Sequence, residues 1–129
     1  MLGIITEAWM RIQRRPVFRA TAAVSFDGWL NGCQAVRAIA QAKLWPANLR
    51  ILDPELAAES AGLDGNKALL IIGFESAEVP QDHVLGEALA IAKSYGGNIA
   101  DDDIAIDDGT GNPTGRSGSV GTWRNAFIE

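Results

Sequence analysis

The feature that most constrains this chain is a near-continuous apolar run from Ala68 to Phe74. The run has the length of a β-strand, and the turn signal Asp64-Gly65-Asn66 comes just before it. A strand without polar alternation is apolar on both of its faces, which is typical of a strand that is covered on both sides. The run therefore predicts the most buried strand of a sheet.

A half-buried strand and an amphipathic helix are predicted earlier in the chain. Apolar side chains at every second position from Phe18 to Phe26 indicate the strand. Asp27 can cap a helix from about Gly28 to Lys43, which Leu44-Trp45-Pro46 ends. The apolar stripe of this helix is expected to consist of Trp29, Cys33, Val36, Ile39 and Ala40.

Two further elements follow that helix. Residues 49–52 are predicted to form a short strand, and Asp53-Pro54 begins a short helix through Leu63, because proline is tolerated at the first helical position. After the buried strand, a second long helix is expected between Pro80 and Gly96-Gly97, which supplies a left-handed cap.

The last part of the chain is predicted to be less regular. An edge strand is expected at 98–100, and a long mobile loop from Asp101 to Ser119. A helix is expected to start near Thr122. From Phe18 onward the order is then βαββαβ with one extra short helix, which predicts an α+β, ferredoxin-like antiparallel sheet with both long helices on one face.

The first residues stand outside this arrangement. Residues 2–13 alternate like a strand that is covered on both sides, and Pro16 breaks the pattern. The chain is also expected to begin inside one element and to end inside another, at 123–129. We therefore expect an excised piece of a larger protein, in which residues 2–13 belong to, or bridge to, a preceding domain.

Composition limits the function classes. With 129 residues, 47% of them hydrophobic, the chain can bury one core. Its formal charge of −5 argues against binding to nucleic acid. Arginines nevertheless gather near the N-terminus, where they form either a basic edge beside an anionic ligand or a solvated strand. These residues are Arg11, Arg14, Arg15 and Arg19.

Apolar runs, the single cysteine and the single histidine indicate location and chemistry. The sequence supports neither a membrane span nor a signal peptide. The single cysteine, Cys33, excludes an internal disulfide, fits a reducing cytoplasm and is expected to be a small buried side chain. His83 has no second histidine and no nucleophile placed beside it, so we expect a surface histidine.

Two loop motifs fail as ligand sites. The segment Gly109–Ser117 lacks the first glycine and the lysine of a phosphate-binding loop, and no buried strand leads into it. The aspartates between 101 and 108 lack the ligand spacing of a calcium loop, so a solvated acidic loop is expected and no metal is predicted. Trp29 and Trp45 are expected in core or interface packing, whereas Trp9 and Trp123 fall in the segments that could face an absent domain.

The order of these pieces matches a known family. The segment Leu2–Ala8, followed by a basic strand that ends at Pro16, resembles the strand that closes the FAD-binding domain of vanillyl-alcohol-oxidase-type flavoenzymes. The remainder resembles their C-terminal FAD-linked oxidase cap domain. The segments Gln34–Ala40, Pro46–Asp53 and Lys93–Gly97 are most similar to the alkyldihydroxyacetonephosphate synthase and glycolate/D-lactate oxidase branch.

This resemblance implies site residues and a cofactor. It assigns Gly3, Ile4, Ile5 and Thr6 to FAD, through backbone that lies against the flavin, and it implies that the pyrophosphate loop lies upstream. We therefore expect that this chain by itself does not retain FAD. The cap is expected to cover the isoalloxazine face and to form part of a small-molecule substrate pocket. Arg116 and Arg124 are weak candidates for substrate contacts. Catalytic residues are expected outside the chain.

The resulting hypothesis divides the chain into two parts. Residues 1–16 would be the end of an FAD-binding domain, and residues 17–129 a cap domain truncated at its C-terminus. The parent would be a cytoplasmic FAD-dependent oxidoreductase that oxidises a 2-hydroxy acid or related alcohol, its partner being its own FAD-binding domain. A flavin-dependent alkyldihydroxyacetonephosphate synthase-like transferase remains an alternative. A freestanding ferredoxin-like module for small-molecule binding or homodimerisation is another.

Overall fold

The computed structural model describes residues 3–110 and 121–122, without the side chain of Asp108. Its sheet is antiparallel throughout and has the strand order β2-β3-β1-β4. The elements are β1 (Phe18–Phe26), α1 (Trp29–Gln41), β2 (Asn48–Leu52), α2 (Pro54–Ala61), β3 (Ala68–Ser76), α3 (Asp82–Ser94), a 3₁₀ helix η1 (Asp101–Asp103) and β4 (Ile104–Asp108). This confirms the predicted α+β, ferredoxin-like fold.

Strand β3 lies inside the sheet, as its apolar run predicts. It pairs with β1 on one side, from Ala68 opposite Phe26 to Ser76 opposite Phe18. It pairs with β2 on the other side. Every residue from Ala68 to Phe74 is buried. A strand with two hydrogen-bonded neighbours and two covered faces has no position for a solvated side chain, which explains the missing polar alternation.

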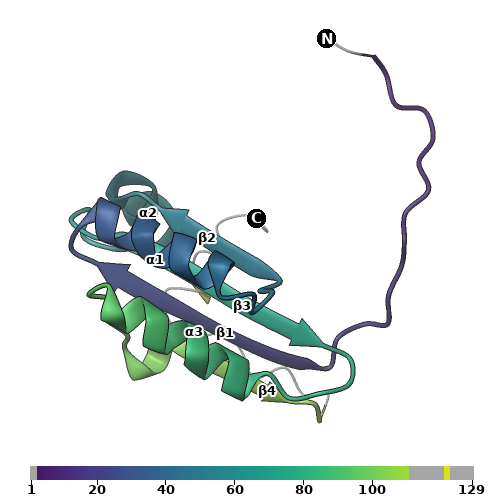
Figure 1. The fold of residues 1–129 in the computed structure, drawn as a ribbon. Helices are drawn as coiled ribbons and strands as arrows, with labels where there is room; N and C mark the ends of the chain where they lie inside the picture. The colour runs from purple at the N-terminus through teal and green to yellow at the C-terminus, as the bar shows by residue number, and fades with distance from the viewer. Residues whose placement is uncertain (1–2, 111–120, 123–129) are drawn as a thin grey trace.

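The main core lies between the sheet and the helices α1 and α3. Both helices cover the same face of the sheet, as predicted (Figure 1). The side chains of this face come from alternate positions of each strand, because successive side chains of a strand point to opposite faces. Its buried members include Ala20, Ala22, Val24, Phe26, Leu70, Ile72 and Phe74 from the sheet and Ala35, Ile39, Leu85 and Ala88 from the helices.

The other face of the sheet is divided into two halves. One half is apolar and lies under α2, where Ala57 and Ala61 pack against Leu52, Leu69 and Ile71. Asp53 begins α2, because its carboxylate Oδ1 accepts a hydrogen bond of 2.8 Å from the Leu56 amide. The other half carries polar side chains, which are described with the candidate site.

The predicted start and stripe of α1 need correction. Gly28 is the N-cap and makes no side-chain cap bond, whereas Asp27 lies 3.8 Å from Lys67 Nζ. The face toward the core is rotated from the predicted stripe. Its buried members are Gly32, Ala35 and Ile39, while Trp29 and Ala40 are exposed. A Cβ at Gly32 would collide with the side chain of Ile51, so close packing on the sheet selects the small-residue face.

The position of the last strand was also predicted wrongly. Asn98 forms only an isolated bridge, its backbone exchanging hydrogen bonds of 2.9 and 2.8 Å with Ser25. After η1, the strand β4 pairs with β1 along Ile104–Asp108. The predicted loop from Asp101 is thus a 3₁₀ turn and a strand as far as Asp108, because pairing with β1 outweighs the low strand preference of aspartate. Residues 111–119 lie outside the described residues.

The N-terminal segment does not form the predicted strand. Residues 3–17 have no helix or strand, and all of them except the half-buried Pro16 are exposed. Residues 3–16, here called the arm, lead away from the sheet as an extended trace (Figure 1). A strand needs a neighbour for its backbone hydrogen bonds, and no described residue pairs with the arm. The predicted helix near Thr122 is described only at Gly121 and Thr122, which are helical.

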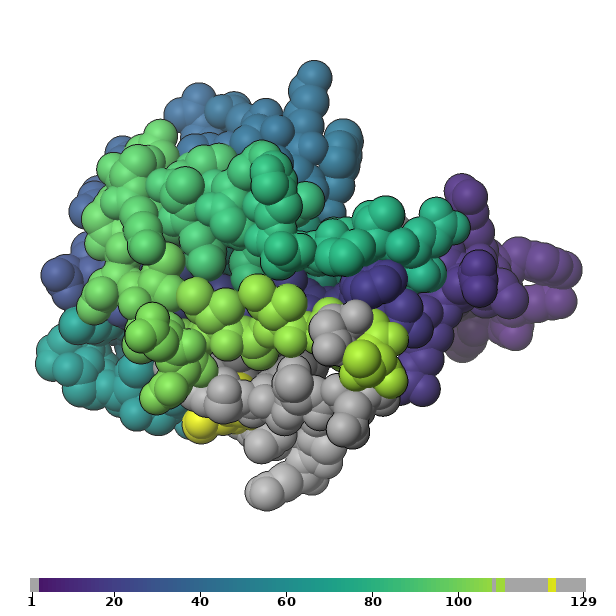
Figure 2. Space-filling model, turned by 90° about the horizontal axis from the view of Figure 1, so that it is seen from below, coloured from purple at the N-terminus to yellow at the C-terminus, as the bar shows by residue number. Residues whose placement is uncertain are grey.

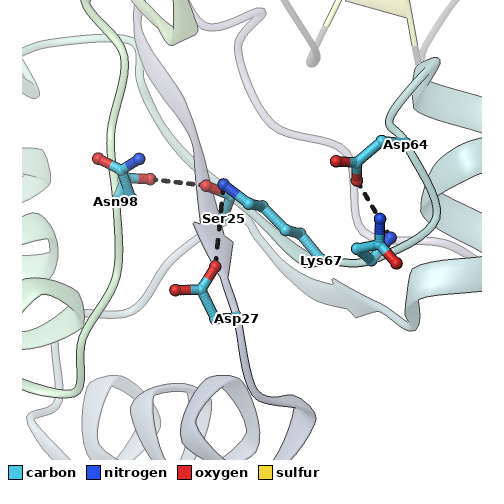
Figure 3. A network of polar contacts seen from close by, with 6 residues as sticks. Ser25, Asp27, Asp64, Lys67 and Asn98 are labelled. Atoms are coloured by element: carbon cyan, nitrogen blue, oxygen red, sulfur yellow. Dashed lines mark hydrogen bonds and ion pairs between the residues drawn. The ribbon is translucent and has the colours of Figure 1, made fainter.

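The two ends of the sheet differ. Where β1 ends, polar contacts lie in and between the loops that connect the helices and strands (Figure 3). They are the Ser25–Asn98 bridge, the Lys67–Asp27 ion pair and the hydrogen bond that the Asp64 carboxylate accepts from the Asn66 amide. Where β1 begins, the arm leaves the sheet, and we call this the arm end. In the part of the chain that is described, no helix is long and apolar enough to cross a membrane.

Candidate functional site

The four residues predicted to contact FAD lie in the arm. Gly3, Ile4, Ile5 and Thr6 are all exposed. Gly3 has φ +151°, a conformation that residues with a side chain rarely adopt, and a Cβ built there would meet nothing within 4 Å. The structure thus places these four residues together in one extended segment, away from the described helices and strands.

The other predicted ligand residues contribute little to a described site. Arg116, Arg124 and Trp123 lie outside the described residues, as does most of the segment Gly109–Ser117. His83 is an exposed side chain in the first turn of α3, 3.3 Å from the carboxylate of Glu87. This position confirms the expected surface histidine.

Cysteine and acidic residues form no described metal site. Cys33 is half-buried on α1. Asp101, Asp102 and Asp103 form η1. Among residues 3–110 and 121–122, no group of three or more histidine, cysteine or acidic side chains is arranged to hold a metal ion.

Sequence reasoning missed a polar row on the second face of the sheet. Arg19 of β1 lies between Glu75 of β3 and Asp107 of β4 in the strand register. Its Nε is 3.6 Å from Glu75 Oε1, an ion pair that is too long for a hydrogen bond, so this buried Nε has no hydrogen-bond partner. Arg19 also donates through Nη2 to the backbone oxygen of Pro16 at 3.4 Å. The alternation of β1 places Arg19 on this face, but only the register brings the two acids beside it.

A second row crosses the same half of the sheet. Asn48 of β2, Gly73 of β3, Thr21 of β1 and Ala105 of β4 are consecutive partners across the four strands. A Cβ at Gly73 would lie 3.5 Å from both the Asn48 and the Thr21 side chains. Gly73 thus lies between two side chains that can form hydrogen bonds.

A hollow of about 690 Å³ lies at the arm end. Its walls are arm residues 11–16, Ala47 before β2, and residues 75–78 at the end of β3. Arg11, Arg14 and Arg15 face it together with Glu75 and Glu78, so its charge is mixed. In Figure 2 the arm extends beyond the folded body at this end. The arginines that were predicted to form a basic edge thus lie beside acidic side chains at the end of β3 and just after it.

A smaller hollow of about 360 Å³ lies on the helical side of the molecule. Gln34, Arg37, Ala38 and Gln41 of α1 and Tyr95 after α3 form its walls. It combines one cation with two amides, which suits a small polar ligand, but nothing else in the described chain converges on it.

The two tryptophans that flank α1 are not core residues. Trp29 is 42% exposed and Trp45 is 82% exposed. Their expected burial in a core is therefore wrong, and interface packing remains the prediction. Trp45 adopts φ +56° and nearby Lys43 φ +58°, which are uncommon values for residues other than glycine.

The described residues do not by themselves fit FAD. A flavin dinucleotide needs a pocket that encloses rings and holds a pyrophosphate. Among the residues that the structure describes, the segment assigned to the flavin is an exposed strand-like arm. It can offer one wall of backbone and apolar side chains, and we therefore derive no reaction step through FAD from this chain.

Comparison with models of protein families gives a match. The family model described as FAD linked oxidases, C-terminal domain, matches residues 15–126. The matched span begins at the end of the arm and includes every described helix and strand. Among curated proteins, no match to the chain was found.

Proposed function

The chain belongs to the family of FAD linked oxidases, C-terminal domain, and from this premise we propose that it is the cap domain of an FAD-dependent oxidoreductase. In this proposal residues 17–129 form the cap, and residues 1–16 connect it to an FAD-binding domain. The parent enzyme oxidises a 2-hydroxy acid or related alcohol. Membership of the family supports an FAD-linked oxidase as the parent protein. The division into domains and the substrate class are our proposals.

The observation that carries this proposal is the polar half of the second sheet face. Among the described elements, helices α1 and α3 pack on one face, whereas α2 packs on the apolar half of the other face. The second half carries Arg19, Thr21, Asn48 and Glu75. A cap needs a surface that can meet a ligand held by another domain, and this polar half has the hydrogen-bonding groups for it.

The chemistry of this half limits the roles of its residues. Asn48 and Thr21 can orient hydroxyl or carbonyl groups of a substrate by hydrogen bonds. Arg19 is flanked by two acids, so this row has no excess positive charge for a carboxylate. Contact with an anionic group stays a prediction for Arg116 and Arg124. When bound to the parent enzyme, FAD supplies the electron transfer.

Two measurements test the proposal. The protein expressed from the complete reading frame is expected to purify with flavin, and its visible flavin absorbance should bleach when 2-hydroxy acids are added without oxygen. The isolated chain is expected to show no saturable FAD binding at micromolar concentrations. Tight FAD binding by the isolated chain, or a reading frame without an FAD-binding domain, would contradict the proposal.

Two alternatives have distinct outcomes in the same experiments. A synthase-like transferase would also purify with flavin, but it would exchange an acyl for an alkyl group without net oxidation of a hydroxy acid. A freestanding ferredoxin-like module would have no flavoprotein parent. The hollow lined by Gln34, Arg37 and Tyr95 favours small-molecule binding in that case.

A further inference from the structure

Exposed large apolar side chains gather at the arm end of the sheet. They come from three separate segments: Val17 before β1 is 41% exposed, Trp45 before β2 is 82% exposed, and Val79 after β3 is 56% exposed. The antiparallel register brings these segments to one end, because Phe18 pairs with Ser76 and Asn48 pairs with Gly73. Isolated exposed apolar residues are ordinary, but three at the end of the sheet where the arm leaves mark a candidate interaction surface.

The backbone holds these side chains in place. The Ser76 hydroxyl accepts hydrogen bonds of 3.1 Å from the amides of Glu78 and Val79. Gln81 Nε2 donates to the Val79 oxygen at 3.0 Å, and the Val17 amide donates to the Ser76 oxygen at 3.1 Å. The turn that carries Val79 is therefore fixed to the start of β1, and the apolar surface is preformed.

Trp45 combines an exposed side chain with an uncommon backbone conformation. Both Lys43 and Trp45 have left-handed backbone, with φ +58° and +56°. Such values for residues other than glycine persist only where the surrounding structure imposes them, and they often mark ligand or switch sites. The α1–β2 loop thus presents the largest side chain of this end outward, which is how an anchor for a protein partner is displayed.

The arm determines which partner can reach this surface. Residues 2–13 have the alternation of a strand that is covered on both sides, yet the arm is exposed in this chain. If they pair as a strand in a neighbouring body, only Arg14, Arg15 and Pro16 separate that strand from Val17. An extended chain from Gln13 to Val17 spans at most about 14 Å. The body that receives the arm is therefore held against the arm end.

We propose that the arm end, formed by Val17, Trp45 and Val79, is the docking surface for the FAD-binding domain of the same polypeptide, with Trp45 as its anchor. This inference rests on the proposed function, because it takes the FAD-binding domain as the body that receives the arm. Tethering by Arg14–Pro16 raises the effective concentration of that domain at this end, so a modest apolar surface is enough for stable docking.

Limited proteolysis of the full-length flavoprotein tests the inference. Docking shields the connection Arg14–Pro16 between the two bodies, so trypsin should cut slowly after Arg14 in the wild-type protein. The Trp45→Ala variant should be cut about tenfold faster or more, since tryptophans at the centre of interfaces dominate docking energies. Trp29→Ala is the matched control, because Trp29 is exposed at the opposite end of α1, and it should be cut at the wild-type rate. Val79→Ser should show a smaller acceleration than Trp45→Ala.

Each outcome separates this inference from the proposed function. Flavin content tests the function, and it should be retained in all three variants. If the protein carries flavin but Trp45→Ala is cut no faster than Trp29→Ala, the docking surface is wrong while the function stands. If size-exclusion chromatography shows that Trp45→Ala dissolves a dimer of the whole protein instead, a second copy occupies the surface and the inference is overturned. A full-length protein without flavin overturns both.

Discussion

The strand β1 and the arm have similar sequence patterns and different structures. Both alternate apolar with other residues, yet β1 pairs on both sides whereas the arm is exposed. The difference is the set of neighbours. Strand β1 has β3 and β4 beside it, α1 and α3 on one face, and α2 near the other. The comparison shows that an alternating pattern makes a segment able to form a strand. The tertiary structure decides whether neighbouring strands are present to pair with it.

The largest expected effect on stability comes from truncating a side chain of β3, the strand next to β1. Ile72 is fully buried in β3, opposite Ala22. The substitution Ile72→Ala should lower the free energy of unfolding by about 3 kcal/mol, because it removes buried apolar atoms and leaves a cavity. Ile12→Ala in the arm is the control and should change it by less than about 0.5 kcal/mol. Urea denaturation of the isolated chain measures both, and equal losses would mean that the arm is packed in solution.

An intermediate effect is expected where β1 meets the segment after α3. A Cβ at Gly97 would lie 2.5 Å from Val24 Cγ1 and 2.8 Å from the Ala92 oxygen. Gly97→Ala should therefore destabilise the chain by about 1 to 3 kcal/mol through overpacking. Gly86→Ala is the control, because Gly86 lies exposed in α3 with nothing near a built Cβ, and it should stabilise by about 0.5 to 1 kcal/mol. A thermal melting temperature that falls for Gly97→Ala and rises for Gly86→Ala is the expected result.

The smallest effect concerns α2, which helps to cover the second face of the sheet. Asp53 caps this helix through the Leu56 amide, so Asp53→Ala should cost about 1 kcal/mol. Asp27→Ala is the matched control, since Asp27 caps no helix and its exposed ion pair with Lys67 is worth little, about 0.5 kcal/mol or less. If the two substitutions cost the same in chemical denaturation, local capping does not determine the stability of α2.

The predictable part of the fold was the part with strong local signals. The apolar run of β3, the alternation of β1 and the proline and glycine signals around α2 and α3 led to the correct order of elements. The errors had a common origin. Residues 98–100 and the true strand β4 are both short and lie beside different parts of β1, and the acidic residues beside Ile104 made the strand look like a loop.

The candidate site was less predictable than the fold. Gly3, Ile4, Ile5 and Thr6 followed only from resemblance, and their contact with FAD stays a prediction. The row Arg19–Glu75–Asp107 joins residues far apart in sequence, so it needed the register of three strands. Trp45 was expected in a core or an interface because of its type, and a local sequence pattern does not reveal the left-handed backbone that turns it outward.

The sequence by itself determined the α+β class and the buried centre at β3, since these depend on apolar patterns and on local turn and capping residues. The family followed from resemblance. Only the tertiary structure decided which alternating segment became a strand, where β4 lies and which face of α1 meets the sheet. The physical reason is that a strand is completed by hydrogen bonds to a neighbour, and a helix face is selected by the shape of the surface beneath it. Those partners are distant in sequence and close only in the folded chain.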